Sequence, residues 1–268
     1  MKGSPVMDFI KKFYVYIILF IMYAPILVLI AFSLTDAELI GHWNGLSLHS
    51  YRMLLSDKEI LTAALNTFVV AFTSAAVSTI LGSLGAIGIF YSSKRSKAIM
   101  EGIGQIPIMN AEIVTALSLT ILFVMAGIRF NFITLLIGHV VLTIPFVVLS
   151  VRPKLMQMDP NIYEAALDLG ATPNKALMKV ILPEVIPGVI SGFILSVTLS
   201  LDDYIITAFT RDTAYQTLST YVYGATSKKG NLPQSLRALT TVITILALIV
   251  LMLANRRSKA EVKKSKHR

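Results

Sequence analysis

The chain has 268 residues, of which 55% are hydrophobic and only 15% are charged. Because its charged residues cluster between long apolar runs, one soluble core cannot bury all of its apolar surface, which excludes an ordinary soluble domain. The formal net charge of +9 could suggest nucleic acid, but the basic residues lie at the ends of apolar runs, and a membrane topology explains them better. The absence of cysteine excludes disulfides and cysteine-ligated metal sites.

Six apolar runs approach or exceed the length of about 20 residues that a helix needs to cross a bilayer. They lie at 13–34, 61–91, 99–126, 131–151, 182–202 and 235–254. The second and third are long enough to be broken or tilted. We therefore predict an all-α membrane protein with six transmembrane helices in one domain, 13–254, between an N-terminal segment, 1–12, and a basic tail, 255–268.

The first apolar run is predicted to remain part of the protein. Lys11 and Lys12 precede it, as the basic region of a signal peptide would. The run continues through Pro25 without a small-residue cleavage site, so we expect a retained helix.

Basic residues indicate which side each loop faces. Four segments, 1–12, 92–98, 152–181 and 255–268, hold 17 of the 24 Lys and Arg residues. By the positive-inside rule these segments are cytoplasmic, and both termini are predicted to lie in the cytoplasm. Anionic lipid could also contact the basic tail.

Small residues mark places where helices could approach closely. Gly188 and Gly192 form a small-xxx-small pair in the fifth run, and Gly82, Gly85 and Gly88 share roughly one side of the second. We expect ordinary helix packing at these positions rather than gating.

Three carboxylates lie inside or at the end of apolar runs. Glu112 is in the third run, and Asp202 and Asp203 stand at the predicted outer end of the fifth. A carboxylate near the bilayer centre costs about 2.5–3.5 kcal/mol, so it normally faces a cavity or a partner. Adjacent helical residues point about 100° apart, so at most one aspartate faces a pathway while the other caps, pairs or meets water.

The carboxylates suggest a cationic solute. Together with a tyrosine such as Tyr204, Tyr221 or Tyr223, they could bind ammonium groups through charge-assisted hydrogen bonds and cation–π contacts. Each aspartate could instead be an ordinary residue at a membrane interface.

The segment 159–183, here called the coupling segment, is a polar island between apolar runs. Asp159 is predicted to cap a short helix that has Pro160 in its first turn and ends at Gly170, which suits a left-handed conformation. Thr172 and Pro173 repeat the signal and begin a second helix, which runs into the fifth apolar run. An ordinary amphipathic loop would share part of this pattern.

The spacing within the coupling segment resembles the EAA loop of ABC importer permeases. The matching residues are Glu164-Ala165-Ala166, Gly170, Val180 and Leu182-Pro183. Val180 departs from the usual isoleucine but remains apolar and β-branched. The resemblance implies a type I (MetI-like) permease fold, with a cytoplasmic coupling helix that inserts into an ATPase subunit. The residues expected to contact the ATPase are Glu164, Ala165, Ala166, Asp168 and Gly170.

Nearly the whole chain resembles the PotC-type permeases of spermidine/putrescine ABC importers. The likeness is clearest at 138–148, at 168–171 and at 198–203, which ends in the Asp202-Asp203 pair. It implies that Glu112 and this pair, with Tyr204 beside it, line the path of a polyamine. Glu112 stands where the family usually has aspartate, so the site or its preference between polyamines could be shifted.

The resemblance also implies a set of partners. These are a dimer of ATP-binding subunits, a second, PotB-like permease and an extracytoplasmic polyamine-binding protein, in the inner membrane of a bacterium. The chain has no G-x-x-x-x-G-K-[ST] segment to hold ATP phosphates. We therefore expect no cofactor, no nucleic-acid partner and no enzymatic activity in this subunit, with ATP hydrolysed by its partner.

Other functions are weighed against this one. An ABC permease for another small solute would share the scaffold. A secondary cation transporter would typically show inverted repeats, and none is convincing here. A membrane enzyme would need a nucleophile, a base or a metal cluster, but the histidines at 42, 49, 139 and 267 have no ligand spacing. His139 is expected to be a hydrogen-bonded interior residue rather than a ligand.

Overall fold

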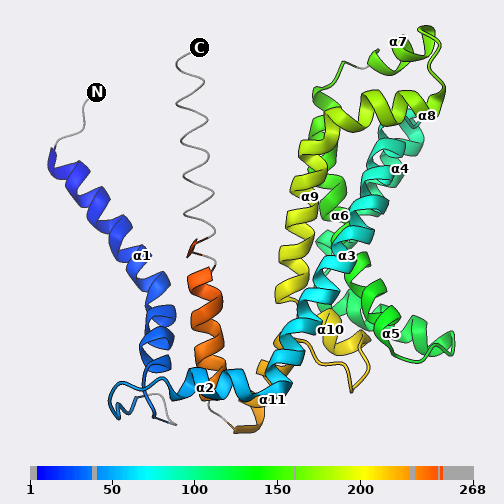
Figure 1. Ribbon diagram of the computed structural model, residues 1–268. Coiled ribbons are helices and arrows are strands. Elements are labelled where there is room, and N and C mark those ends of the chain that lie inside the picture. The colour runs from blue at the N-terminus through cyan, green and yellow to red at the C-terminus, as the bar shows by residue number, and fades with distance from the viewer. Residues whose placement is uncertain (1–4, 38–40, 160, 230–232, 247, 250–268) are drawn as a thin grey trace. The chain divides into compact units, whose positions relative to one another are not determined.

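The computed structural model describes residues 5–37, 41–159, 161–229, 233–246 and 248–249 (Figure 1). Regular structure in these stretches is helical, apart from an isolated bridge between Thr35 and Leu46. The chain forms two compact units, one of residues 62–221 and one of residues 1–61 with 222–268.

The unit formed by the two ends of the chain contains helix α1, Pro5–Ser33, and the short helix α2, His49–Ser56. Residues 13–33 of α1 are long and apolar enough to cross a membrane, as predicted. Residues 234–246 are also helical, at the predicted sixth span, but the end of that span and the basic tail lie outside the described residues. The six-helix count therefore stays a prediction.

A buried arginine ties this unit together. Arg237 has no exposed surface, and its guanidinium donates hydrogen bonds to the carbonyls of Ala37, at 3.0 Å, and Phe32, at 3.4 Å. The Ser33 and Tyr51 hydroxyls are 2.9 Å apart and link α1 to α2. Polar contacts thus hold the connection that follows α1.

The central unit begins within α3, Lys58–Phe90, which is continuous over 33 residues, or about 50 Å. The third predicted span is not one helix. It consists of α4, Lys94–Met109, and α5, Glu112–Met125, which meet at an angle of 104°. Pro107 and Asn110 just before the bend both have low helix propensity. The predicted third span is thus broken, as its length allowed, and Glu112, the first residue of α5, stands directly after the break.

Helices α6, Phe132–Gln157, and α9, Leu182–Asp202, form the core of this unit, at the fourth and fifth predicted spans. They approach closely at the two glycines of α9. A Cβ on Gly188 would lie 2.8 Å from the Ser150 carbonyl oxygen, and one on Gly192 would lie 3.2 Å from the Val147 Cα. The predicted close approach at this pair is confirmed.

The three glycines of α3 differ from one another. A Cβ on Gly82 would lie 2.7 Å from the Val147 Cβ of α6, whereas Gly85 and Gly88 face open space. Only the first of them therefore serves the packing of α3 on α6. Val147 of α6, which is fully buried, is therefore contacted by both α3 and α9.

The remaining described helices of the central unit are short. α7, Ile162–Asp168, α8, Pro173–Ala176, and the π-helical turn Leu177–Ile181 precede α9, whereas α10, Ile205–Thr210, follows it. α11, Leu218–Lys229, begins in this unit and ends outside it. Among the residues described, four helices could cross a membrane, or five if α4 and α5 together count as one broken span.

Candidate functional site

Two groups of predicted residues lie at opposite ends of α9 (Figure 1). The coupling segment precedes the helix and the two aspartates close it. Since α9 has 21 residues, these ends are about 30 Å apart. Any communication between them must pass along or around this helix.

The first helix of the coupling segment, α7, begins later than predicted. Asn161, not Asp159, occupies the N-cap position, and its side chain makes no capping hydrogen bond. Asp159 instead accepts the Asn161 N–H on Oδ1 at 2.9 Å, which closes a turn ahead of the helix. Pro160 lies outside the described residues. The prediction that Asp159 caps the helix is therefore wrong, because its side chain bonds the Asn161 N–H, which lies before the first helical residue.

The end of α7 is as predicted. Gly170 has a φ of +83°, in the left-handed region. The Ala171 N–H donates to the Ala166 carbonyl at 3.0 Å and the Gly170 N–H to the Leu167 carbonyl at 2.8 Å. These two bonds form a Schellman motif, which ends the helix and turns the chain sharply.

One side of α7 holds it to the protein and another is exposed. Ile162 and Tyr163 pack against the buried core formed by α3, α6 and α9, and the Tyr163 ring lies 5.1 Å from the ring of Tyr91. Glu164 and Ala165 are exposed, and Ala166 is partly exposed. The predicted contact residues therefore present a small, flat surface with a carboxylate.

Leu169 was not singled out from the sequence, yet 89% of its surface is exposed beside Gly170. An exposed leucine on a turn is weak evidence by itself. Its place next to Asp168 and Ala165 makes it part of the same surface. The sequence signal that could have found it is its position at the C-cap of a helix that ends in glycine.

The second helix of the coupling segment begins at Pro173, as predicted, with Thr172 in the N-cap position. The Thr172 side chain makes no capping hydrogen bond, so of the two residues predicted to start this helix only Pro173 acts as expected. A π-helical turn, Leu177–Ile181, then joins α8 to α9. Such turns often occur at functional sites. Val180 lies within this turn.

At the other end of α9, Asp203 is buried and fully bonded. Its Oδ1 accepts the Ile206 N–H at 3.1 Å, and its Oδ2 accepts the N–H and hydroxyl of Thr207 at 2.8 and 2.7 Å. The carboxylate therefore caps the start of α10. Asp202, the last residue of α9, is exposed. Of the two roles expected for the pair, capping thus falls to Asp203.

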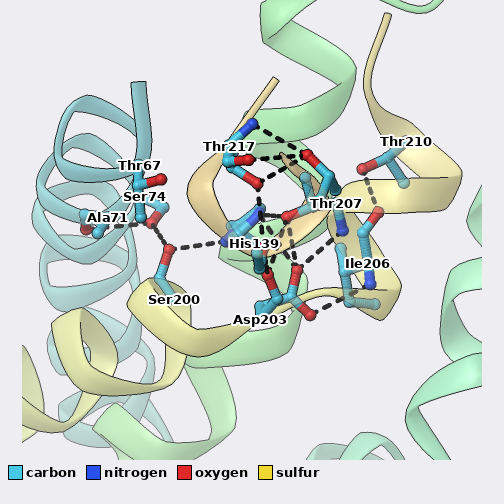
Figure 2. Close-up of polar contacts among 12 residues, drawn as sticks. Thr67, Ala71, Ser74, His139, Ser200, Asp203, Ile206, Thr207, Thr210 and Thr217 are labelled. Carbon is cyan, nitrogen blue, oxygen red and sulfur yellow. Dashed lines mark hydrogen bonds and ion pairs between the residues drawn. The ribbon is translucent and has the colours of Figure 1, made fainter. Parts of the chain in front are cut away.

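His139 of α6 lies beside this cap (Figure 2). It is buried, and its two ring nitrogens contact the hydroxyls of Ser200, at 2.7 Å, and Thr207, at 2.9 Å. Nε2 also lies 3.5 Å from Oδ2 of Asp203. The prediction of a hydrogen-bonded interior histidine is confirmed, but its link to Asp203 was missed, because 64 positions of sequence separate the two residues.

Glu112 joins the two aspartates. It lies close enough to Asp203 for their carboxyl groups to interact directly, and the charge of Asp202 also acts on it. The contact of α5 with α10 brings it there, and the Thr120 hydroxyl supports this contact by donating to the Phe209 carbonyl at 3.0 Å. Tyr204, at the N-cap of α10, is partly buried beside the pair.

These three carboxylates, here called the carboxylate cluster, come from α5 and from the junction of α9 and α10. Like charges near one another favour a bound cation, especially where surrounding apolar groups lower the dielectric constant. Within the described part of the chain, no group of three or more His, Asp or Glu side chains is arranged to hold a metal ion. The negative charge of the cluster would attract a cation.

Comparison with known sequences and structures extends this picture. The family described as "Binding-protein-dependent transport system inner membrane component" matches residues 6–263. The chain is 33% identical over 231 residues to the "Spermidine/putrescine transport system permease protein PotC" of Escherichia coli K12, covering 86% of this chain and 87% of that protein. It is 32% identical over 246 residues to the protein of the same description from Haemophilus influenzae, covering 92% and 95%.

A third relative is the "Putrescine transport system permease protein PotI" of Escherichia coli K12, 30% identical over 233 residues, with 83% of this chain and 81% of that protein covered. Among solved structures, a chain of a bacterial ABC transporter that imports the polysaccharide alginate has a TM-score of 0.72 at 16% identity, covering 96% and 98%. A chain of the MetNI methionine ABC transporter has a TM-score of 0.58 at 16% identity, covering 79% and 97%. At such identities these two show a shared fold.

Proposed function

Since the chain belongs to the family of inner membrane components of binding-protein-dependent transport systems, we propose that it is the permease subunit through which an ATP-driven importer moves polyamines. It is a membrane-embedded, all-helical transporter subunit and not an enzyme. The family implies that its partners include an ATP-binding subunit and a substrate-binding protein.

The observation that carries the substrate class is that Glu112 lies beside Asp203 and within reach of the charge of Asp202. Polyamines are flexible chains with two or more ammonium groups, and separate carboxylates can bind such groups one at a time through charge-assisted hydrogen bonds. The relatives named for spermidine and putrescine transport support the same substrate class. Asp203 is buried and already has three hydrogen-bond donors, so the exposed Asp202 and the partly exposed Glu112 are the carboxylates placed to meet the solute.

The opposite end of α9 supports the coupling role. The exposed face of Glu164 and Ala165, with Asp168 and Gly170 at its edge, would enter a cleft of the ATP-binding subunit on the cytoplasmic side. A second, PotB-like permease would supply the other half of the pathway and a matching loop. ATP-driven closure would draw the two loops together and open the carboxylate cluster outward, with both termini of the chain in the cytoplasm.

Transport then requires that the carboxylate cluster alternate between a state that receives the polyamine and a state that releases it. The cluster would receive the polyamine from the binding protein when it faces outward and release it when the subunits return. The solute contributes to coupling only to the extent that it binds the two states with different affinities.

A reconstituted complex tests this function. The chain, its ATP-binding subunit, the second permease and the binding protein are placed in liposomes, and uptake of labelled spermidine and putrescine is followed. We expect saturable uptake that requires ATP and the binding protein. The paired change Glu112→Gln with Asp202→Asn should reduce uptake roughly tenfold or more, because each lost charge-assisted contact contributes about 1.5–3 kcal/mol.

Glu59→Gln is the matched control, since Glu59 is an exposed carboxylate in the first turn of α3. It should leave uptake unchanged. Polyamine uptake by the chain without any ATP-binding subunit would instead identify a secondary transporter. Uptake of another solute, with none of either polyamine, would identify an importer of different specificity.

A further inference from the structure

A directed series of hydrogen bonds leads to Asp203, one member of the carboxylate cluster (Figure 2). The Thr207 hydroxyl donates to Oδ2 of Asp203 at 2.7 Å, so its oxygen is left to accept from Nε2 of His139 at 2.9 Å. Nε2 therefore carries the proton of a neutral ring, and Nδ1 accepts from the Ser200 hydroxyl at 2.7 Å. Ser200 in turn accepts from Ser74, at 3.2 Å.

This hydrogen-bond network joins four helices at one point. Ser74 belongs to α3, His139 to α6, Ser200 to α9 and Thr207 to α10. All of these side chains are buried. Buried polar groups that lose a partner are costly, so the network favours one arrangement of the four helices around the ring. A single neutral imidazole satisfies both neighbours because one nitrogen donates while the other accepts.

The network ends on a member of the carboxylate cluster. Asp203 accepts a hydrogen bond from Thr207, and the position of Thr207 depends on its bond with His139. The Asp203 carboxyl group also interacts directly with Glu112. The Asp203 carbonyl also accepts the Ser219 hydroxyl at 2.6 Å, which fixes the backbone beside Asp202. A displacement of the ring would therefore move the cluster as well as the helices.

We propose that His139 is a positioning residue for the polyamine site, which acts through Thr207 and Asp203 to set the spacing of the carboxylates and hence the preference between a diamine and a longer polyamine. The inference rests on the function proposed above. The histidine itself does not meet the solute, because it is buried beside the cap. Its effect is on the shape of the site rather than on its charge.

The ratio of spermidine to putrescine uptake tests this role. A loss of folded protein lowers both rates alike and leaves their ratio unchanged, whereas a shifted cluster changes the ratio. In the reconstituted complex, His139→Leu should shift the ratio by roughly threefold or more, the size expected for residues coupled in one network. His139→Gln, which keeps a donor and an acceptor, should restore part of the wild-type ratio.

Two further variants isolate the route of the effect. Thr207→Val removes the relaying hydroxyl and should reproduce the shift, and the double variant with His139→Leu should shift the ratio no further than either single one. Ser78→Ala is the matched control. Its hydroxyl is equally buried, on α3, and contacts the Thr143 hydroxyl at 2.6 Å, while Thr143 keeps its own bond to the His139 carbonyl at 2.8 Å. It should leave the ratio unchanged.

The possible outcomes separate this inference from the proposed function. A wild-type ratio in His139→Leu and Thr207→Val, at whatever total uptake, would show a structural role only and overturn the inference. If His139→Leu does not fold, Thr207→Val decides in the same way. If the wild-type complex imports neither polyamine, the proposed function fails, and the role of His139 fails with it.

Discussion

The two ends of α9 differ in how their polar groups find partners. At the carboxylate end, Asp203 and Thr207 are buried and bonded to each other and to His139 within the chain. At the coupling end, Glu164 is exposed and 89% of the surface of Leu169 faces outward. The chain itself organises the first region before any solute arrives. The second presents a surface that a neighbouring subunit would complete.

If this contrast is correct, removal of Asp203 should have the largest effect on stability. Asp203→Ala leaves the buried N–H groups of Ile206 and Thr207 without their acceptor and removes the cap of α10, which should lower the free energy of unfolding by roughly 3 kcal/mol. Unfolding of the purified protein in detergent measures this change. The exposed neighbour is the control, and Asp202→Ala should change stability by less than about 0.5 kcal/mol. Equal effects of the two variants would contradict the contrast.

The helix between the two ends should be next in sensitivity. A Cβ on Gly188 would lie 2.8 Å from the Ser150 carbonyl and 3.1 Å from the Val151 Cα, both in the backbone of α6. Gly188→Ala must therefore push α6 and α9 apart and should cost about 1–3 kcal/mol. Gly85→Ala, where a Cβ meets open space, should be neutral or slightly stabilising. The same unfolding measurement compares the two, and no difference between them would mean that the helices are loosely packed.

At the coupling end, the largest effect on structure should come from the turn. Gly170→Ala places a side chain at a φ of +83° and should cost about 1–2 kcal/mol. Because α7 has few internal contacts, this strain should be released locally, as faster hydrogen exchange at the Ala171 amide that closes the turn. Gly102→Ala in α4 serves as the control, since it has no positive φ and no close neighbour. Unchanged exchange at Ala171 would show that the turn does not need glycine.

Local signals in the sequence were sufficient for much of the fold. Apolar runs predicted four helices that the structure shows to be long and apolar enough to cross a membrane, and Gly170 and Pro173 predicted one helix end and one helix start. These features depend on residues within a few positions of each other, so the sequence shows them directly. Asp159 was misassigned because its side chain accepts the Asn161 N–H in a turn just ahead of α7, and the sequence does not show which of these two polar residues the helix follows.

The carboxylate cluster was predicted only as a set of residues. Charge in an apolar setting singled out Glu112, Asp202 and Asp203. The cap that Asp203 makes is local, because it bonds residues three and four positions on, but nothing local shows that His139 or Glu112 lies beside it. Those contacts depend on how α6 packs on α9 and α10. The bend that places Glu112 at the start of α5 was likewise visible only as a weak break signal. Long-range packing therefore decided which residues surround the Asp203 cap.

The smallest effect on stability is expected at Glu164, together with a large effect on transport. Glu164→Ala removes an exposed side chain from α7, so the free energy of unfolding should change by less than about 0.5 kcal/mol. If this carboxylate contacts the ATP-binding subunit, ATP hydrolysis by the reconstituted complex should continue while polyamine uptake falls roughly tenfold, since a charge-assisted contact contributes about 1.5–3 kcal/mol. Hydrolysis and uptake are measured on the same liposomes, with Glu59→Ala as the control. Normal uptake by Glu164→Ala would remove α7 as the docking helix, whereas a large loss of stability would show that the coupling end is organised internally like the carboxylate end.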